Sequence, residues 1–429
     1  MRGAIFSRPF LVLAVLVASL AIAHGQAGGF DPVFAGGSPL NIQVDSFSPL
    51  EGQVVLSNGN IVLLTYRSVN GRYVNRLTGI TAAGEIDTSF GNNGFVDFAW
   101  SDVVSSDRAS NIEVQNVLGA ERIVVSGGWS QANGRKTPTR LLRIDRFLPN
   151  GQSDTAFGTQ GRAAFPNAGD GVVDLLIQRD GNILCQGDYG VLVRVRSNGS
   201  SIDTSFGSSG VVNTGQRGSR LAIDADDRIY VTGRLGSGKG KGSTIYPSVT
   251  RYTPGGIVDA TFGSNGNALV PFATASAGDI VIDGSGNIVL GGTDSAGGNQ
   301  DFAVYRLTSG GALDTTFNGS GRSIFPDFGG RDELQIGLAV QTNGKAVLAG
   351  RASYDTALEP NRFAVVRFNA DGTIDTDFGV SGAATWSLNQ FSSLVNVTAR
   401  CENEDCTSES LMVSGGATPY IVVAKLNGN

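Results

Sequence analysis

One short motif, an aspartate followed three residues later by a phenylalanine, recurs seven times along the 429 residues of this chain. The copies are Asp31 and Phe34, Asp87 and Phe90, Asp154 and Phe157, Asp203 and Phe206, Asp259 and Phe262, Asp314 and Phe317, and Asp375 and Phe378. The phenylalanines lie 49 to 67 residues apart, about 57 on average. Such a period indicates a repeat array in which each period forms one supersecondary unit.

Each period also contains short apolar runs separated by turn residues. In the sixth period these runs are 338–340, 345–350 and 363–368, with Asn343-Gly344 between the first two. An Asn-Gly or Asp-Gly pair between apolar runs is a strong hairpin signal, because both central residues of a type I′ turn need positive φ. A fourth run follows each Phe motif, and no window has a sustained 3.6-residue period. We therefore expect four antiparallel strands per repeat and no helix of consequence.

Four short strands in about 50 residues are typical of a β-propeller blade, whereas a β-helix coil is shorter. The sequence begins the array with a fourth-type strand at 39–44, and it ends with three strands at 394–400, 411–415 and 420–426. These two parts complete one blade. We predict an all-β, seven-bladed β-propeller of four-stranded antiparallel blades, a single domain over 28–429, with residues 38–46 joining 394–426 to close the ring.

The repeat also resembles a known family. Asp371-Gly-Thr-Ile-Asp375-Thr-Asp-Phe378-Gly379-Val-Ser-Gly382 is similar to the signature of the bacterial delta-60 repeat, and the resemblance covers 29–429. Ala35 and Asn318 depart from it by replacing the glycine after Phe. The resemblance implies an exported propeller and carries no catalytic residues with it.

The first 27 residues have the features of a secretory signal peptide. Arg2 and Arg8 precede an apolar run at 11–23, which is too short to span a bilayer and ends in small residues. We predict cleavage after Ala23 or Ala27. The mature protein is then expected to be secreted or periplasmic, without membrane insertion.

Charge and histidine content exclude several function classes. Without residues 1–27 the chain has 30 basic and 38 acidic residues, a net charge of −8, which disfavours nucleic acid as a partner. The only histidine, His24, lies in or beside the segment to be removed, so histidine catalysis and histidine metal ligation are disfavoured. The Asp-Gly-x-x-Asp spacing lacks the oxygen ladder that calcium needs. We expect no metal, no cofactor and a monomer.

We interpret the repeated motif as structural. Its Phe is predicted to pack between neighbouring sheets, and its Asp to accept backbone N–H groups at a turn. A basic residue, usually eight positions earlier, is predicted to pair with this Asp, although a ring of cations could instead bind an anion. These basic residues are Arg76, Arg146, Arg194 or Arg196, Arg251, Arg306, Arg367 and Lys425.

The three cysteines divide into a pair and a single residue. Cys401 and Cys406 flank a four-residue segment, and in an oxidising compartment a local disulfide is the first expectation. A free pair and a metal site are the alternatives. Cys185 stands in an apolar run and is interpreted as a small core residue.

The sequence constrains the function of this protein less than it constrains the fold. The long loops on one face of the ring are candidate binding loops, and their aromatic residues are candidate ligand contacts: Trp100, Trp129, Tyr246 and Tyr354. We predict a non-catalytic binding or scaffold module for an unknown protein or glycan. The alternative is a lyase, lactonase or hydrolase at the channel mouth. The predicted inner strands, such as 54–56 and 175–177, contain few acids, which disfavours the enzyme; converging carboxylates there would favour it.

Overall fold

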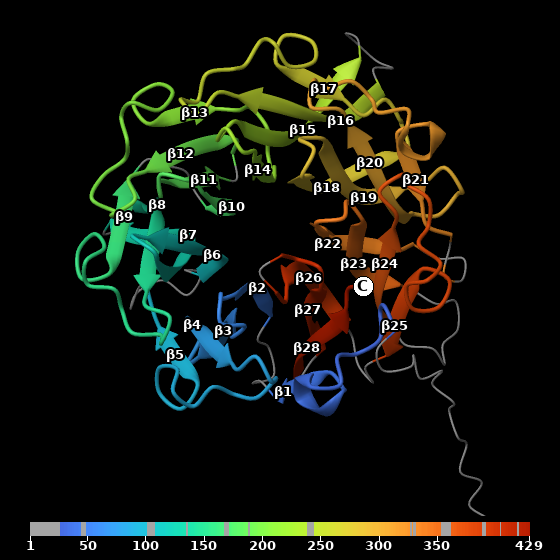
Figure 1. Cartoon of the computed structure of the whole chain (residues 1–429). Coiled ribbons are helices and arrows are strands. Elements are labelled where there is room, and N and C mark those ends of the chain that lie inside the picture. The colour runs from blue at the N-terminus through green and yellow to red at the C-terminus, as the bar shows by residue number, and fades with distance from the viewer. Residues whose placement is uncertain are drawn as a thin grey trace, which may run out of the picture.

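Seven four-stranded antiparallel sheets surround a central channel as the blades of a propeller (Figure 1). The computed structural model describes residues 26–43, 49–100, 108–133, 136–166, 171–187, 189–237, 244–326, 328, 332–352, 362–387, 392–403, 405–417 and 420–429. Within these ranges, helical structure is confined to two 3₁₀ turns, η1 (Phe34–Gly36) and η2 (Phe317–Gly319). No helix in the described ranges has the length and hydropathy to cross a bilayer. The predicted fold class is confirmed.

Each of the first six blades uses four consecutive strands, ordered outward from the channel. Blade 1 contains β2 (Leu50–Val55), β3 (Ile61–Val69), β4 (Arg72–Ile80) and β5 (Phe95–Phe98). Blade 2 contains β6 (Arg108–Val117), β7 (Ala120–Asn133), β8 (Lys136–Phe147) and β9 (Arg162–Pro166). Blade 3 contains β10 (Val172–Ile177), β11 (Ile183–Gly187), β12 (Val191–Val195) and β13 (Val211–Asn213).

The next three blades repeat this order. Blade 4 contains β14 (Leu221–Ile223), β15 (Ile229–Ser237), β16 (Thr244–Tyr252) and β17 (Asn267–Leu269). Blade 5 contains β18 (Ala275–Ile282), β19 (Ile288–Asp294), β20 (Asp301–Leu307) and β21 (Arg322–Ile324). Blade 6 contains β22 (Leu334–Val340), β23 (Ala346–Ala352), β24 (Arg362–Phe368) and β25 (Ala383–Ser387).

Blade 7 is built from both ends of the sequence. It contains β26 (Ser392–Cys401), β27 (Glu409–Ala417), β28 (Tyr420–Asn427) and, as its outer strand, β1 (Leu40–Gln43). β1 pairs antiparallel with β28 in the register Leu40 to Val423 and Gln43 to Tyr420. The predicted closure is therefore confirmed by β1, while residues 44–46 of the predicted strand lie outside the described part of the chain. Closure pairs an edge that would otherwise be free.

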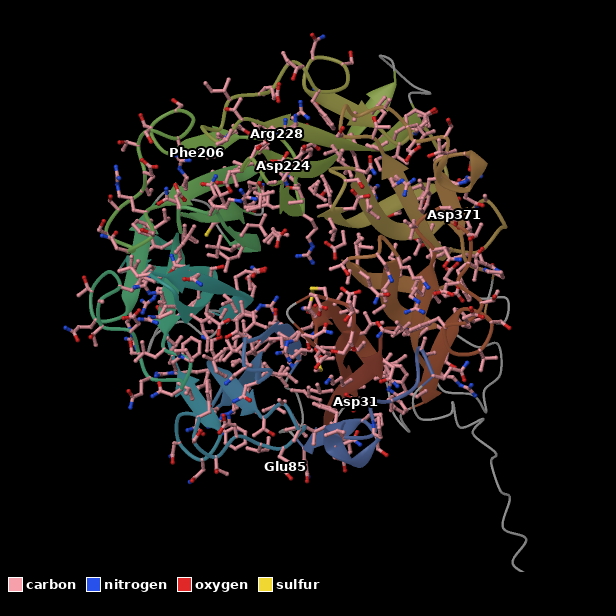
Figure 2. The ribbon with its side chains drawn as sticks, viewed as in Figure 1. Asp31, Glu85, Phe206, Asp224, Arg228 and Asp371 are labelled. Carbon is pink, nitrogen blue, oxygen red and sulfur yellow. A yellow bond between two sulfur atoms is a disulfide. The ribbon has the colours of Figure 1, made fainter. Side chains whose placement is uncertain are left out.

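The motif phenylalanines form the packing between blades. All seven are at most 2% exposed, and Figure 2 shows Phe206 in the outer part of the ring, away from the channel. Each ring lies under a turn glycine of the next blade. At Gly199, for example, a Cβ would approach the Phe157 ring to 2.5 Å, and the φ of +70° also favours glycine.

Arg367 illustrates the unit that holds each turn. Its Nε donates to Asp375 at 2.6 Å, and its guanidinium carbon lies 4.6 Å from the centre of the Phe378 ring. The same ion pair, at 2.7–2.9 Å, occurs in four other Arg–Asp pairs and one Lys–Asp pair: Arg146–Asp154, Arg194–Asp203, Arg251–Asp259, Arg306–Asp314 and Lys425–Asp31. Asp31 lies beside β28 and β1 at the rim (Figure 2). Because each of these cations faces its own carboxylate, they do not form an open anion site.

Blade 1 departs from this pattern, so the predicted Arg76–Asp87 pair is wrong. Arg76 Nε pairs with Asp97 Oδ1 at 2.7 Å, and Asp87 instead accepts a hydrogen bond from Asn60 at 3.0 Å. The residue eight positions before Asp87 is Gly79. Its carbonyl accepts the Asp87 N–H, just as the Arg367 carbonyl accepts the Asp375 N–H, so Gly79 takes the place that arginine has in blade 6. A Cβ at Gly79 would come within 2.5 Å of Phe90, which leaves no room for arginine.

The cysteines occupy two different environments. Cys401 and Cys406 form a disulfide across the turn between β26 and β27, with their Cα atoms 4.8 Å apart. Cys185 is buried in β11 and packs in the cluster between blades 2 and 3. The disulfide therefore closes one hairpin of blade 7.

Candidate functional site

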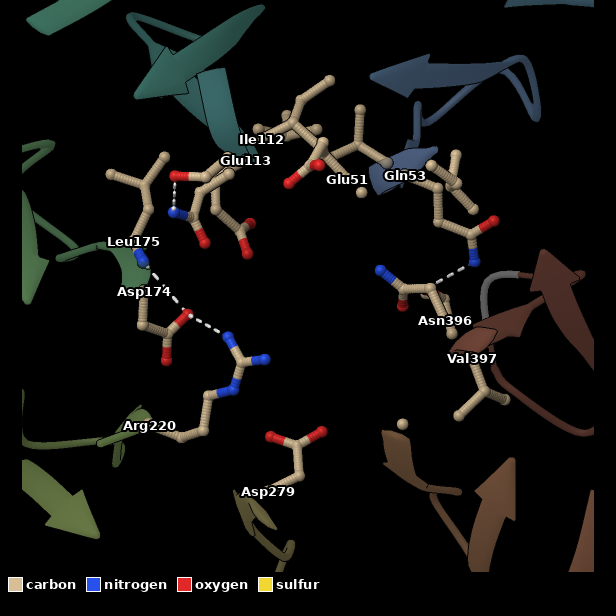
Figure 3. A pocket seen from close by; sticks show the side chains of 18 of the residues that line it. Glu51, Gln53, Ile112, Glu113, Asp174, Leu175, Arg220, Asp279, Asn396 and Val397 are labelled. Atoms are coloured by element: carbon tan, nitrogen blue, oxygen red, sulfur yellow. Dashed lines mark hydrogen bonds and ion pairs between the residues drawn. The ribbon is translucent and has the colours of Figure 1, made fainter. Parts of the chain in front are cut away.

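The inner strands enclose a cavity of about 650 Å³ at the centre of the ring. Its lining comes from all seven blades and includes four acidic residues, Glu51, Glu113, Asp174 and Asp279, and one basic residue, Arg220. Figure 3 shows these five side chains projecting from different blades around the hollow. The rest of the lining is made of small, amide and aliphatic residues. We refer to Glu51, Glu113, Asp174, Arg220 and Asp279 as the channel cluster.

Three members of the channel cluster occupy equivalent places in consecutive blades. Asp174 is paired with Gln186 of β11, and Asp279 is paired with Gly291 of β19. The Arg220 carbonyl accepts the N–H of Thr232 in β15. Each of these three partners lies three residues after the isoleucine that begins the second strand of its blade. The residues at this position around the ring are Gly52, Asn111, Asp174, Arg220, Asp279, Gly337 and Asn396. A negative, a positive and a negative side chain thus follow one another around one side of the channel.

The two aspartates also connect neighbouring blades. Asp174 Oδ2 accepts the Leu221 N–H at 2.6 Å, and Asp279 Oδ2 accepts the Leu338 N–H at 3.1 Å. Arg220 Nη1 donates to the Val173 carbonyl at 2.9 Å and lies 3.9 Å from Asp174 Oδ1. These bonds fix the three side chains from the backbone, so their positions are set before any ligand arrives. They also mean that the aspartates contribute to blade association.

The two glutamates are held less tightly. Glu51 Oε1 lies 3.6 Å from Arg108 Nη1, the one ion pair that involves it within the described residues. Glu113 makes no ion pair with any side chain in the described ranges. Both side chains are partly buried, and both line the cavity.

Burial raises the pKa of every carboxyl group in the channel cluster. The pKa of Glu51 rises to about 7, opposed by Arg108, and that of Glu113 rises to about 8, with a further contribution from the charge of Asp174. The pKa of Asp174 rises to about 6 although Arg220 opposes the shift, and burial also raises that of Asp279. The cluster therefore retains protons near neutral pH, and a bound cation would displace them by favouring the ionised form.

The expectation that the inner strands present few acids is wrong. Asp174 and Asp279 stand directly before the apolar residues Leu175 and Ile280, at positions adjacent to a β-bulge in each pairing. The interpretation missed them because the inner strands were taken to be the apolar runs alone, and these acids stand one residue before such runs. The available signal was the polar residue that directly precedes the inner apolar run in several blades, as Arg220 precedes Leu221.

The predicted aromatic site does not assemble in the described residues. Trp100 is only 6% exposed; its ring packs in the core beside Phe98, and its Nε1 donates to Asp145 at 3.0 Å. Because this ring is buried, the expectation that it contacts a ligand is wrong. Tyr246 is half-buried in β16, paired with Leu235. The Trp129 side chain and Tyr354 lie outside the described part of the chain.

A metal site is not supported by the geometry. Among the side chains that the structure describes, no three histidine, cysteine or acidic groups lie close enough together to hold an ion. The four carboxyl groups of the channel cluster therefore surround the cavity without converging on one point.

Comparison with known proteins supports the fold. A family described as "Domain of unknown function (DUF5122) beta-propeller" matches residues 284–317 and 341–378. The chain is a β-propeller repeat protein. No curated protein is similar to it at a significant level.

Several solved propeller structures are similar to this chain over most of their length. The WD40 propeller domain of Doa1 is 9% identical, with 93% of this chain and 96% of that chain covered and a TM-score of 0.45. The C-terminal WD40 domain of Sif2 is 8% identical, with 90% of this chain and 98% of that chain covered and a TM-score of 0.46. The structure of YCF48 bound to D1 peptide is 10% identical, with 90% of this chain and 95% of that chain covered and a TM-score of 0.43. Likeness at this level carries no information about a ligand or partner.

Proposed function

We propose that this protein is an exported, non-catalytic β-propeller that binds an organic cation in its central channel. The bound group is an ammonium or guanidinium, carried by a small molecule or by a lysine or arginine side chain of a surface protein. Export to the periplasm or the exterior is supported by the signal-like residues 1–27. Binding is supported by the channel cluster.

The observation that carries the proposal is the charge of the cavity wall. Four carboxyl groups surround the cavity, and Arg220 is the one basic side chain among its lining residues. A hollow that is enclosed by protein and lined mostly by acidic groups concentrates cations. A cation would replace the solvent that burial has removed from Glu51 and Glu113, and it would lie beside Asp174 and Asp279, whose side chains are already positioned by hydrogen bonds to the backbone.

A neutral carbohydrate fits this cavity less well. Sugar sites commonly use aromatic rings as flat contact surfaces, and none of the cavity-lining residues that the structure describes is aromatic. The amide groups of Asn111, Asn396 and Gln53 could still bind hydroxyl groups. A glycan is therefore the second class of ligand to be tested at the same cavity.

Calorimetric titration tests the proposal directly. The probes are spermidine and arginine amide as cations, citrate as an anion, and maltose as a neutral sugar. We expect only the cations to bind, and the double variant Glu51→Gln and Glu113→Gln to weaken them at least about tenfold, or about 1.4 kcal/mol. Glu85→Gln, at an exposed turn, is the matched control. Absence of cation binding, or equal affinity in the double variant, would contradict the proposal.

An enzyme acting on a ligand in the same channel is the second candidate. It is favoured by one observation, the different pKa values of Glu113, about 8, and Asp174, about 6, which would supply a proton donor and an acceptor at neutral pH. Assays with lactone, ester and glycoside substrates distinguish it from a binding protein. Turnover that Glu113→Gln abolishes without loss of affinity would favour the lyase, lactonase or hydrolase interpretation.

A further inference from the structure

The turn that follows the third strand has the same geometry in six blades. In blade 6 the turn glycine, Gly372, donates its N–H to the Asn369 carbonyl at 2.8 Å. The residue before it is Asp371, and its backbone carbonyl accepts the N–H of Asn318 at 2.6 Å. Asn318 directly follows the motif Phe of blade 5. One turn thus ends the third strand of its own blade and contacts the preceding blade.

In blade 7 the two halves of this turn come from distant parts of the sequence. Gly28 takes the glycine position and donates to the Asn427 carbonyl at 2.8 Å. Ala27 takes the preceding position and accepts the N–H of Gly379, which follows the motif Phe of blade 6, at 2.8 Å. Gly28 has a φ of +77°, and a Cβ there would lie 3.1 Å from the Phe378 ring.

Gln26 and Ala27 are integrated into the fold. Ala27 is 8% exposed and belongs to the core cluster that contains Phe378. The Gln26 side-chain amide donates to the Gly379 carbonyl at 3.2 Å, and the Gln26 carbonyl accepts the Gly29 N–H at 2.9 Å. Removal of these two residues would leave the Gly379 N–H without its acceptor.

We propose that signal-peptide cleavage leaves Gln26 and Ala27 on the mature protein, so that the bond hydrolysed is the one after Ala23 and not the one after Ala27. This inference rests on the export part of the proposed function. Cleavage after Ala27 would place a charged α-ammonium on Gly28, beside the buried Phe378 ring, where desolvation opposes charge. Cleavage after Ala23 keeps Gln26 and Ala27 as neutral peptide units.

The sequence provides a suitable bond at that place. Ala21-Ile22-Ala23 has the A-x-A form that signal peptidases recognise. Hydrolysis adds one water across the Ala23–His24 peptide bond, which leaves a carboxylate on Ala23 and an α-amino group on His24. The new terminus is then two residues before Gln26 in the sequence.

The test is the N-terminus of the exported protein, expressed from the full chain in a secreting bacterium and measured by intact mass and N-terminal sequencing. A terminus at His24 supports the inference. A terminus at Gly28 on exported protein overturns it and leaves export intact, whereas an uncleaved chain in the cytoplasm overturns export and, with it, this inference.

A second measurement tests the structural reason independently of export. Mature chains that begin at His24 and at Gly28 are prepared with native ends and compared by thermal unfolding. We expect the melting temperature of the shorter chain to be lower by about 5 °C, because a buried hydrogen bond is lost and a charge is added. Melting temperatures within about 1 °C of each other would overturn the structural reason given for retaining Gln26 and Ala27.

Discussion

The Arg367 guanidinium lies between the carboxylate of Asp375, 2.6 Å away, and the face of the Phe378 ring, and its second nitrogen donates to the Gly428 carbonyl of the next blade. One side chain therefore links the two repeated residues of its own blade to the neighbouring blade. The equivalent arginines reach across in the same way, as Arg251 does to the Ser309 carbonyl at 3.0 Å. This relationship explains why Asp, Phe and Arg repeat together.

Arg367→Ala is expected to lower the free energy of unfolding by about 3–5 kcal/mol, because it removes one of the two cations that pair with a buried carboxylate, together with the contacts of Arg367 to Phe378 and Gly428. The side chains of Arg367 and Asp375 are only 1% and 5% exposed. Urea unfolding followed by circular dichroism measures the loss. Arg76→Ala is the control, since the Arg76 and Asp97 side chains are 27% and 33% exposed and such a pair contributes about 0–1 kcal/mol. Equal losses in both variants would contradict this role for Arg367.

Acid should destabilise the ring through these aspartates. Burial alone would raise the pKa of Asp375, but hydrogen bonds and charge from Lys345 and Arg367 outweigh it and lower the pKa below 3.8. The hydroxyl of Thr261, followed by Arg251, lowers the pKa of Asp259 in the same direction. A carboxyl group whose pKa is lower in the folded protein than in the unfolded chain stabilises the fold when the pH is above its unfolded pKa. This stabilisation is lost as the pH falls through the pKa of the folded protein. Unfolding midpoints should therefore fall below about pH 4, and midpoints that stay constant from pH 5 to about 2 would contradict the prediction.

Phe262→Ala should lower the free energy of unfolding by about 3–5 kcal/mol, the cost typical of a fully buried phenylalanine. The Phe262 ring is inaccessible to solvent and packs against Tyr230 and the turn glycine Gly311. Leu118→Ala, at a fully exposed turn position, should change stability by less than about 0.5 kcal/mol. A melting temperature for Phe262→Ala close to that of Leu118→Ala would show that the motif phenylalanine is not a packing residue.

Glu113→Gln should stabilise the protein at alkaline pH. The pKa of Glu113 is raised from 4.5 to about 8 by burial, so its contribution to stability is present below pH 4.5 and is lost as pH rises through about 8. The neutral glutamine does not incur this loss. Chemical unfolding at about pH 5 and pH 9 should show a smaller decrease for Glu113→Gln than for the natural chain, with Glu85→Gln unchanged. An identical pH dependence in all three proteins would refute the raised pKa.

The fold was predictable because the repeated residues make packing contacts that every blade needs. The motif phenylalanines, the turn glycines and the unpaired strand at 39–44 were sufficient to predict seven blades and their closure. The spacing of eight residues located the Arg–Asp pairs of blades 2, 4, 5 and 6. The pair of blade 3 is nine residues apart, and that of blade 7 joins Lys425 to Asp31 from opposite ends of the array. In blade 1, Arg76 pairs with Asp97 instead. There Phe90 requires glycine at position 79, and this close contact cannot be read from one sequence.

The channel cluster was not predictable by the same reasoning. The direction in which the Asp174 and Asp279 side chains point depends on the β-bulges beside them, and a β-bulge is seen only once the pairing of the strands is known. Glu51, Glu113 and Arg220 meet them because the ring brings together strands that are far apart in the sequence. Trp100 was misassigned for a related reason: its partner Asp145 lies 45 residues away in β8, and that hydrogen bond holds the ring in the core.

Proton release on ligand binding is the most direct test of the channel as a cation site. Calorimetric titration with arginine amide at about pH 7, repeated in two buffers of different ionisation enthalpy, gives the number of protons exchanged. Because a bound cation lowers the raised pKa values of Glu51 and Glu113, binding should release protons, and the Glu51→Gln and Glu113→Gln double variant should release fewer. Binding without proton release, or release that the double variant does not change, would contradict the proposed site.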